Sequence, residues 1–79
     1  MIAKTIEYRG ETYDRSHGSP FDRGSADSWY SRPQEPHWYP EGTGHGKRIE
    51  SQDMSIAEMR AYYRGYEYNE EFGGKKSWD

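Results

Sequence analysis

The side chains best suited to chemistry in this sequence are arginines and aromatic rings, which are interleaved between Pro20 and Tyr39. Arg, Trp and Tyr are the residue types that dominate the binding energy of protein–protein interfaces. Aromatic rings also stack on the bases of single-stranded nucleic acid, but such sites lie in positively charged grooves. Here Asp22, Asp27 and Glu35 balance the arginines of the segment. The pattern therefore favours a protein partner, with nucleic acid as the weaker alternative.

The candidate partner-binding residues come from this segment and from a helix near the C-terminus. They are Arg23, Trp29, Tyr30, Arg32, Trp38, Tyr39, Arg64 and Tyr68. The chain contains no Leu and no Val, so its aromatic rings must also supply the core. The same rings are thus equally good candidates for the core, with one or two left at the surface as anchors.

The histidines do not predict a metal site. His17, His37 and His45 lie far apart in the sequence, whereas zinc ligands usually come in pairs two to five residues apart. All three are expected in loops, where an exposed histidine is ordinary. The chain has no cysteine, which excludes a thiolate zinc site. We therefore expect no metal and no cofactor.

No catalytic residue is predicted either. The glycine-rich run from Gly42 to Arg48 is one residue short of the spacing of a phosphate-binding loop and lacks the hydroxyl residue after its lysine. The neighbouring carboxylates Glu70 and Glu71 point apart on a helix. A core this small leaves little room for a water-excluding pocket. We expect a binding protein and not an enzyme.

Composition limits the class of the molecule. The 79 residues have room for a single domain, and the formal net charge is −3. A small secreted domain would normally need disulfides, and no segment is long and apolar enough to cross a membrane. The sequence therefore predicts a cytoplasmic protein with a loosely packed core, and it leaves open whether a partner or a second copy assists folding.

The expected fold is α+β and begins with a β-hairpin over residues 4–15. Two short alternating segments flank Arg9-Gly10, which predicts a two-residue turn with glycine at positive φ. This turn places Ile6 opposite Tyr13 and puts Ile6, Tyr8 and Tyr13 on one face.

Residues 16–48 are expected to be irregular, because proline and glycine recur too often for a long element. One short helix fits, with Ser25 as its N-cap and its end at Ser31. In the turn before it, Asp22 would accept backbone amides, Arg23 would pair with Asp27, and Gly24 would give the backbone freedom ahead of the cap. These residues would form a structural motif that presents Trp29 and Tyr30.

The second helix is predicted over residues 55–72. Ser55 and Glu58 have the spacing of a capping box, in which each side chain bonds the backbone amide of the other. Gly73-Gly74 would end the helix. Its apolar residues divide into one stripe that includes Ile56 and a second, alongside it, that includes Tyr68.

The run Pro20–Tyr30 (PFDRGSADSWY), followed by Arg32, Pro36-His37 and Tyr39, resembles a pattern in small uncharacterised proteins of tailed bacteriophages and prophages. The ending from Tyr62 to Trp78 is similar to the way those proteins close. The resemblance spans about residues 8–79 and implies a phage accessory protein, with no activity to carry over. A fainter likeness to ribosome modulation factors lies in Arg64-Gly65-Tyr66 and Trp78.

The expected function is that of a small phage-type host-interaction protein. It would act in the bacterial cytoplasm, binding a host protein such as a defence or regulatory factor and modulating or inhibiting it by occupying its surface. Two alternatives remain open at this point. One is an RNA- or ribosome-binding module with stacked aromatic rings, and the other is a homo-oligomeric or minor structural phage protein.

Overall fold

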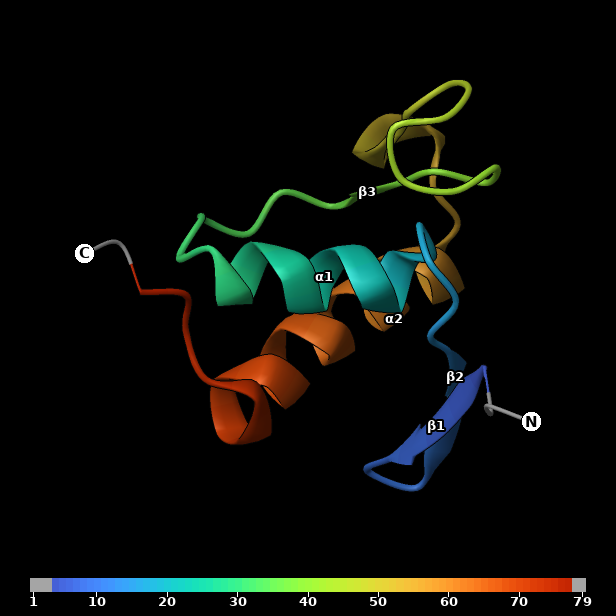
Figure 1. The fold of residues 1–79 in the computed structure, drawn as a ribbon. Coiled ribbons are helices and arrows are strands. Elements are labelled where there is room, and N and C mark those ends of the chain that lie inside the picture. Colours follow the sequence, from blue (N-terminus) through green and yellow to red (C-terminus); the bar gives the residue numbers. More distant parts are fainter. Residues whose placement is uncertain (1–3, 78–79) are drawn as a thin grey trace.

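A hairpin, a helix, a short two-stranded ribbon and a second helix follow one another in the computed structural model, which describes residues 4–77 (Figure 1). The strands are β1 (Thr5–Tyr8), β2 (Glu11–Asp14), β3 (His37–Trp38) and β4 (Ile49–Glu50), and the helices are α1 (Pro20–Trp29) and α2 (Ile56–Tyr68). The predicted α+β class with an N-terminal hairpin is therefore confirmed. Trp78, which is part of the resemblance, lies outside the described residues.

The hairpin has the predicted turn and register. Arg9 and Gly10 both have positive φ, 53° and 80°, which is the geometry of the two-residue turns that match the twist of a hairpin. Ile6 pairs with Tyr13, and Tyr8 pairs with Glu11. The rings of Tyr8 and Tyr13 are buried on one face. A local turn signal was thus enough to fix this element.

The first helix begins earlier than predicted. Ser19, and not Ser25, is the N-cap: its Oγ accepts a hydrogen bond from the Asp22 amide at 3.2 Å, and Pro20 occupies the first helical position. Asp22 accepts a backbone amide as expected, from Gly18 at 2.9 Å. The helix runs on to Trp29, so Ser25 lies in its interior.

Gly24 is also inside this helix, where it is needed for packing and not for backbone freedom. A Cβ on Gly24 would lie 1.9 Å from the carbonyl oxygen of Tyr62, and one on Gly65 would lie 2.0 Å from that of Phe21. The backbones of α1 and α2 therefore touch where the two helices cross. Two glycines allow this approach, since any side chain would hold the helices apart.

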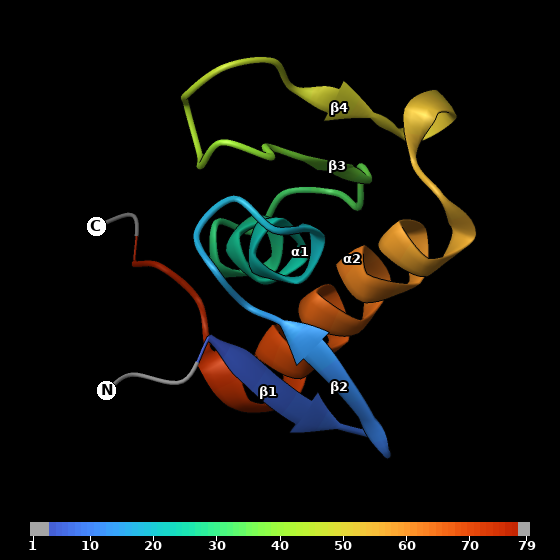
Figure 2. The ribbon, with the colours of Figure 1, turned by 90° about the vertical axis from the view of Figure 1, so that its right-hand side faces the viewer.

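The segment after α1 is less irregular than expected. Strands β3 and β4 form a short antiparallel ribbon, with His37 opposite Glu50 and Trp38 opposite Ile49. Figure 2 shows this ribbon on one side of α1 and the hairpin on the other. The helix α1 is thus the central element, and its two sides carry different structures.

The second helix has the predicted beginning and end. The Ser55 hydroxyl accepts from the Glu58 amide at 3.1 Å, and the Glu58 carboxylate accepts from the Ser55 amide at 2.8 Å. The 13 residues of α2 are followed by a five-residue π-helical turn, Asn69–Gly73, and by Gly74 at positive φ. Ile56, expected in an apolar stripe, is 80% exposed.

The core is built from rings, as the composition required. Tyr13 stacks on Phe21 with 5.3 Å between ring centroids, and Tyr68 meets Tyr8 edge-on at 5.4 Å. Tyr62 is fully buried on the opposite side of the helix pair. No helix within residues 4–77 combines the length and the apolar character that crossing a membrane requires.

Candidate functional site

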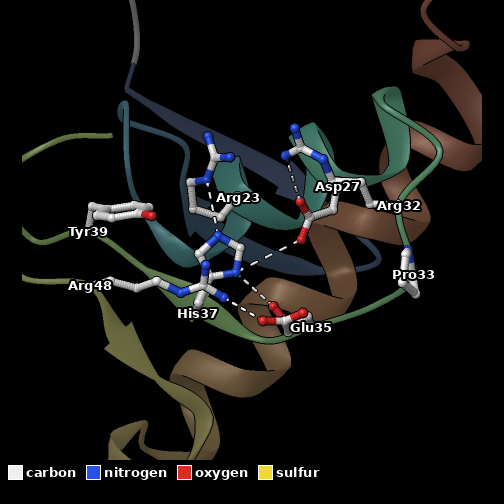
Figure 3. A pocket seen from close by; sticks show the side chains of 8 residues that line it. All are labelled: Arg23, Asp27, Arg32, Pro33, Glu35, His37, Tyr39 and Arg48. Carbon is white, nitrogen blue, oxygen red and sulfur yellow. Dashed lines mark hydrogen bonds and ion pairs between the residues drawn. The ribbon is translucent and has the colours of Figure 1, made fainter. Parts of the chain in front are cut away.

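A polar pocket of about 260 Å³ opens between α1 and the β3–β4 ribbon. It is lined by Arg23, Asp27, Arg32, Pro33, Glu35, His37, Tyr39 and Arg48 (Figure 3). Arg23 and Asp27 are one turn apart on α1, so they share a face. The others come from the connection after α1, from β3 and from the approach to β4. The pocket therefore depends on segments that are distant in sequence.

His37 is the centre of the pocket's hydrogen-bond network. Its side chain is buried, and Nδ1 lies 2.7 Å from the carbonyl oxygen of Glu35, which can only accept. Nδ1 therefore holds the proton. Nε2 accepts from Nε of Arg23 at 3.4 Å. Nδ1 also lies 3.9 Å from Oδ2 of Asp27, so both ring nitrogens are engaged, which suits a positioning role better than proton transfer.

Asp27 and Tyr62 form the buried base of the site. The Tyr62 hydroxyl donates to Oδ2 of Asp27 and accepts from the Glu35 amide at 2.9 Å. Burial, and next the hydrogen bond to the Asp27 carboxylate, raise the pKa of Tyr62 above its ordinary value. The hydroxyl therefore stays protonated and holds α1, α2 and the β3 connection together.

Three arginines surround this base with different exposure. The side chain of Arg23 is 12% exposed, that of Arg48 34% and that of Arg32 55%. Arg32 lies 3.6 Å from Oδ1 of Asp27, and Arg48 lies 2.7 Å from Glu35. The expected pair of Arg23 with Asp27 does not form. Arg23 contacts His37 instead, while Asp27 contacts Arg32 and Tyr62.

The formal charge of the lining is positive. Three arginines against Asp27 and Glu35 leave a net charge of +1 while His37 is neutral. Partial burial lowers the pKa of Arg48, but Glu50, Tyr39 and Glu35 raise it more, so this guanidinium is firmly charged. A fork of N–H donors in a half-enclosed pocket is suited to holding an oxyanion.

The other predicted binding residues lie in three places. Trp29, which is 38% exposed, and Tyr30 lie at the C-terminal end of α1, where the Arg32 guanidinium is 4.7 Å from the Tyr30 ring. Trp38 is half-buried on β3, and within the described residues its indole N–H has no hydrogen-bond partner. We call the group Trp29, Tyr30 and Arg32 the α1 end.

The structure does not bring Arg64 and Tyr68 to this site. Arg64 pairs with Glu67 at 2.8 Å on the surface of α2. Tyr68 packs against the core rings of Tyr8 and Phe21. The two residues that the α2 pattern offered are therefore separate from the pocket.

Sequence reasoning missed His37, Glu35, Arg48 and Tyr62 as site residues. His37 was expected in a loop and exposed, but it lies in β3 and is 4% exposed. The available signal was the run His37-Trp38-Tyr39 between two prolines, which is typical of a short strand bounded by turns. Arg48 and Tyr62 come to the site only through tertiary contacts, which no local sequence pattern predicts.

Comparisons with protein-family models, with curated proteins and with solved structures give no match to this chain. Among residues 4–77, no group of three or more His, Cys, Asp or Glu side chains is arranged to hold a metal ion. The site must therefore be interpreted from its own geometry.

Proposed function

We propose that this chain is a small binding protein that recognises another protein through the α1 end and the adjoining pocket. The resemblance to phage accessory proteins points to a bacterial host protein as the partner. Binding would modulate or inhibit that partner by covering part of its surface. The reaction chemistry, if any, would belong to the partner.

The position of Arg32 is the observation on which this proposal rests. Its guanidinium lies both over the face of Tyr30, at 4.7 Å, and against Asp27 of the pocket, at 3.6 Å. One half-exposed arginine thus joins a surface with the exposed Trp29 and the half-buried Tyr30 to a charged cavity. Trp, Tyr and Arg at the centre of an interface are the side chains whose truncation weakens binding most.

The C-terminal segment supports this surface. The amide of Lys76 donates to the carbonyl of Trp29 at 2.8 Å, and Lys75 Nζ donates to the carbonyl of Ser28 at 3.0 Å. The end of α1 is therefore held by a second piece of chain. A surface held in place before binding loses less conformational entropy when a partner docks.

A capture experiment with matched variants tests the proposal. The tagged chain is incubated with bacterial lysate, and the protein retained in equal molar amount is identified and its affinity measured. We expect Trp29→Ala to weaken binding by at least about thirtyfold, the effect of an interface hot spot. Tyr63→Ala is the control, because Tyr63 is also 38% exposed but lies on α2 and is not part of the α1 end.

Four results would contradict the proposal. The lysate could yield no partner in equal molar amount, or both variants could bind as tightly as the unchanged chain. Capture that is abolished by ribonuclease would replace the protein partner with RNA. A defined oligomer of the chain alone, dissociated by Trp29→Ala, would instead favour self-assembly.

A further inference from the structure

Arg23 has an unusual environment for a nearly buried charge. Within the described residues its guanidinium makes two hydrogen bonds, to His37 at 3.4 Å and to the Thr43 hydroxyl at 3.2 Å, both long. Its nearest carboxylate, on Asp22, is 3.9 Å away. A guanidinium has five N–H donors, and buried charges are normally paired closely. Arg23 therefore has donor capacity that this structure does not use.

The other two arginines are also able to accept a new partner. Arg32 is 3.6 Å from Asp27, which is beyond hydrogen-bond length, and Asp27 already receives the Tyr62 hydroxyl. Nε of Arg48 lies 3.1 Å from the Glu50 carboxylate, but it is not aligned for a hydrogen bond. An incoming oxyanion can thus engage both side chains: Asp27 keeps its bond from Tyr62, and Glu35 and Glu50, which now contact Arg48, are exposed enough to be solvated by water.

The charge of the lining selects the kind of oxyanion. Asp22 and Glu50 lie just outside the lining, beside Arg23 and Arg48, so a carboxylate with a single negative charge meets less repulsion here than a more highly charged anion. A phosphate with about two negative charges would be over-neutralising and would face the carboxylates of Asp27 and Glu35. The cavity of about 260 Å³ is far larger than the roughly 30 Å³ that one water occupies, so it can admit an acidic side chain.

From these contacts we propose that the pocket binds the carboxylate of a Glu or Asp side chain presented by the partner, with Arg23 and Arg48 as its main donors. This inference rests on the proposed function, since it names what the partner places in the cavity. Trp29, the exposed ring of the α1 end, then contacts the apolar surroundings of that acidic side chain.

Nuclear magnetic resonance titration of the ¹⁵N-labelled chain tests this directly. The probe is the peptide acetyl-Gly-Glu-Gly-amide, and its neutral counterpart has Gln in place of Glu. Inorganic phosphate at matched ionic strength is the third arm, and free acetate is the fourth. We expect saturable shifts of the Arg23 and Arg48 Nε–H signals with the Glu peptide, weaker binding of acetate and phosphate, and no saturable shift with the Gln peptide.

Charge-matched variants distinguish binding of the carboxylate in the pocket from non-specific electrostatic attraction to the protein. Arg48→Gln and Arg64→Gln remove the same charge from side chains that are both 34% exposed, but only Arg48 lines the pocket. We expect Arg48→Gln to weaken binding of the Glu peptide at least about tenfold, and Arg64→Gln to leave it unchanged. Arg23→Lys keeps the charge but loses the planar fork, so we expect it to weaken binding as well.

Each of three results would overturn the carboxylate site. They are equal shifts with the Glu and Gln peptides, tighter binding of phosphate than of the Glu peptide, and equal losses of binding in Arg48→Gln and Arg64→Gln. The same spectra report whether each variant is folded. If Arg23→Lys does not fold, Arg48→Gln alone tests the carboxylate site. These titrations need no partner. If a captured partner depends on Trp29 but the Glu peptide does not bind, only this inference is refuted. If the Glu peptide binds but no such partner is captured, only the protein-binding function is refuted.

Discussion

The contact between the backbones of α1 and α2 leads to a sharp prediction about Gly65→Ala. In an isolated helix this change should be stabilising, because alanine has the better helix propensity by about 1 kcal/mol. Here the added methyl group would lie 2.0 Å from the carbonyl oxygen of Phe21. We expect the steric effect to dominate.

The magnitude follows from how far the helices must move. An ordinary contact needs about 3.4 Å, so the crossing would have to open by roughly 1.4 Å at this point. Gaps of this size forfeit a large part of the dispersion energy along the interface. Overpacking of a well-packed core costs up to about 3 kcal/mol. After subtracting the propensity gain of about 1 kcal/mol, we expect a net loss of about 2 kcal/mol.

Urea denaturation followed by circular dichroism is the appropriate assay. Ala57→Gly serves as the control, because Ala57 is exposed in the first turn of the same helix and reports the effect of an alanine–glycine exchange away from the crossing. We expect Gly65→Ala to lower the free energy of unfolding, and its double variant with Gly24→Ala to lose less than the sum of the single losses, since both changes open the same crossing. A Gly65→Ala chain as stable as the unchanged one, or more stable, would refute the reasoning.

Three further predictions concern hydrogen bonds and use the same assay. Ser55→Ala removes the capping box and should cost about 1 kcal/mol, whereas Ser51→Ala, at a serine that is not a helix cap, should be neutral. Tyr62→Phe leaves the buried Asp27 carboxylate without its donor and should cost about 1–3 kcal/mol; a smaller cost than that of Ser55→Ala would contradict the buried network. Because the folded state raises the pKa of Tyr62, its contribution is complete below about pH 10 and is lost as the pH rises further. The alkaline fall in stability should therefore be smaller in Tyr62→Phe, and Tyr13, whose pKa is raised by burial, contributes to the part that remains.

The parts of the fold that could be predicted are those determined by neighbours in the chain. The Arg9-Gly10 turn fixes the register of the hairpin, and the Ser55–Glu58 capping box fixes the start of α2. The absence of Leu and Val correctly predicted a core of rings. In each case the information lies within a few residues or in the composition.

The remaining features depend on contacts between distant segments. Gly24 was interpreted as a sign of backbone freedom, although it lies inside α1. A glycine is needed there because Tyr62 of α2 passes too close for a side chain. That misreading also displaced the N-cap from Ser19 to Ser25. The pocket was only half predicted for the same reason: Arg23, Arg32 and Tyr39 were candidates, but His37 and Arg48 become neighbours only when β3 pairs with β4.

The contact between Tyr8 and Glu71 limits when the chain can fold during its synthesis. Their hydrogen bond, at 2.9 Å, joins residues 63 positions apart. The hairpin leaves the ribosome before the end of α2 that covers its aromatic face. A nascent or prematurely terminated chain would expose Tyr8 and Tyr13 to solvent. Such a product would be a target for chaperones and proteases, so folding must largely wait until the segment that contains Glu71 has been translated.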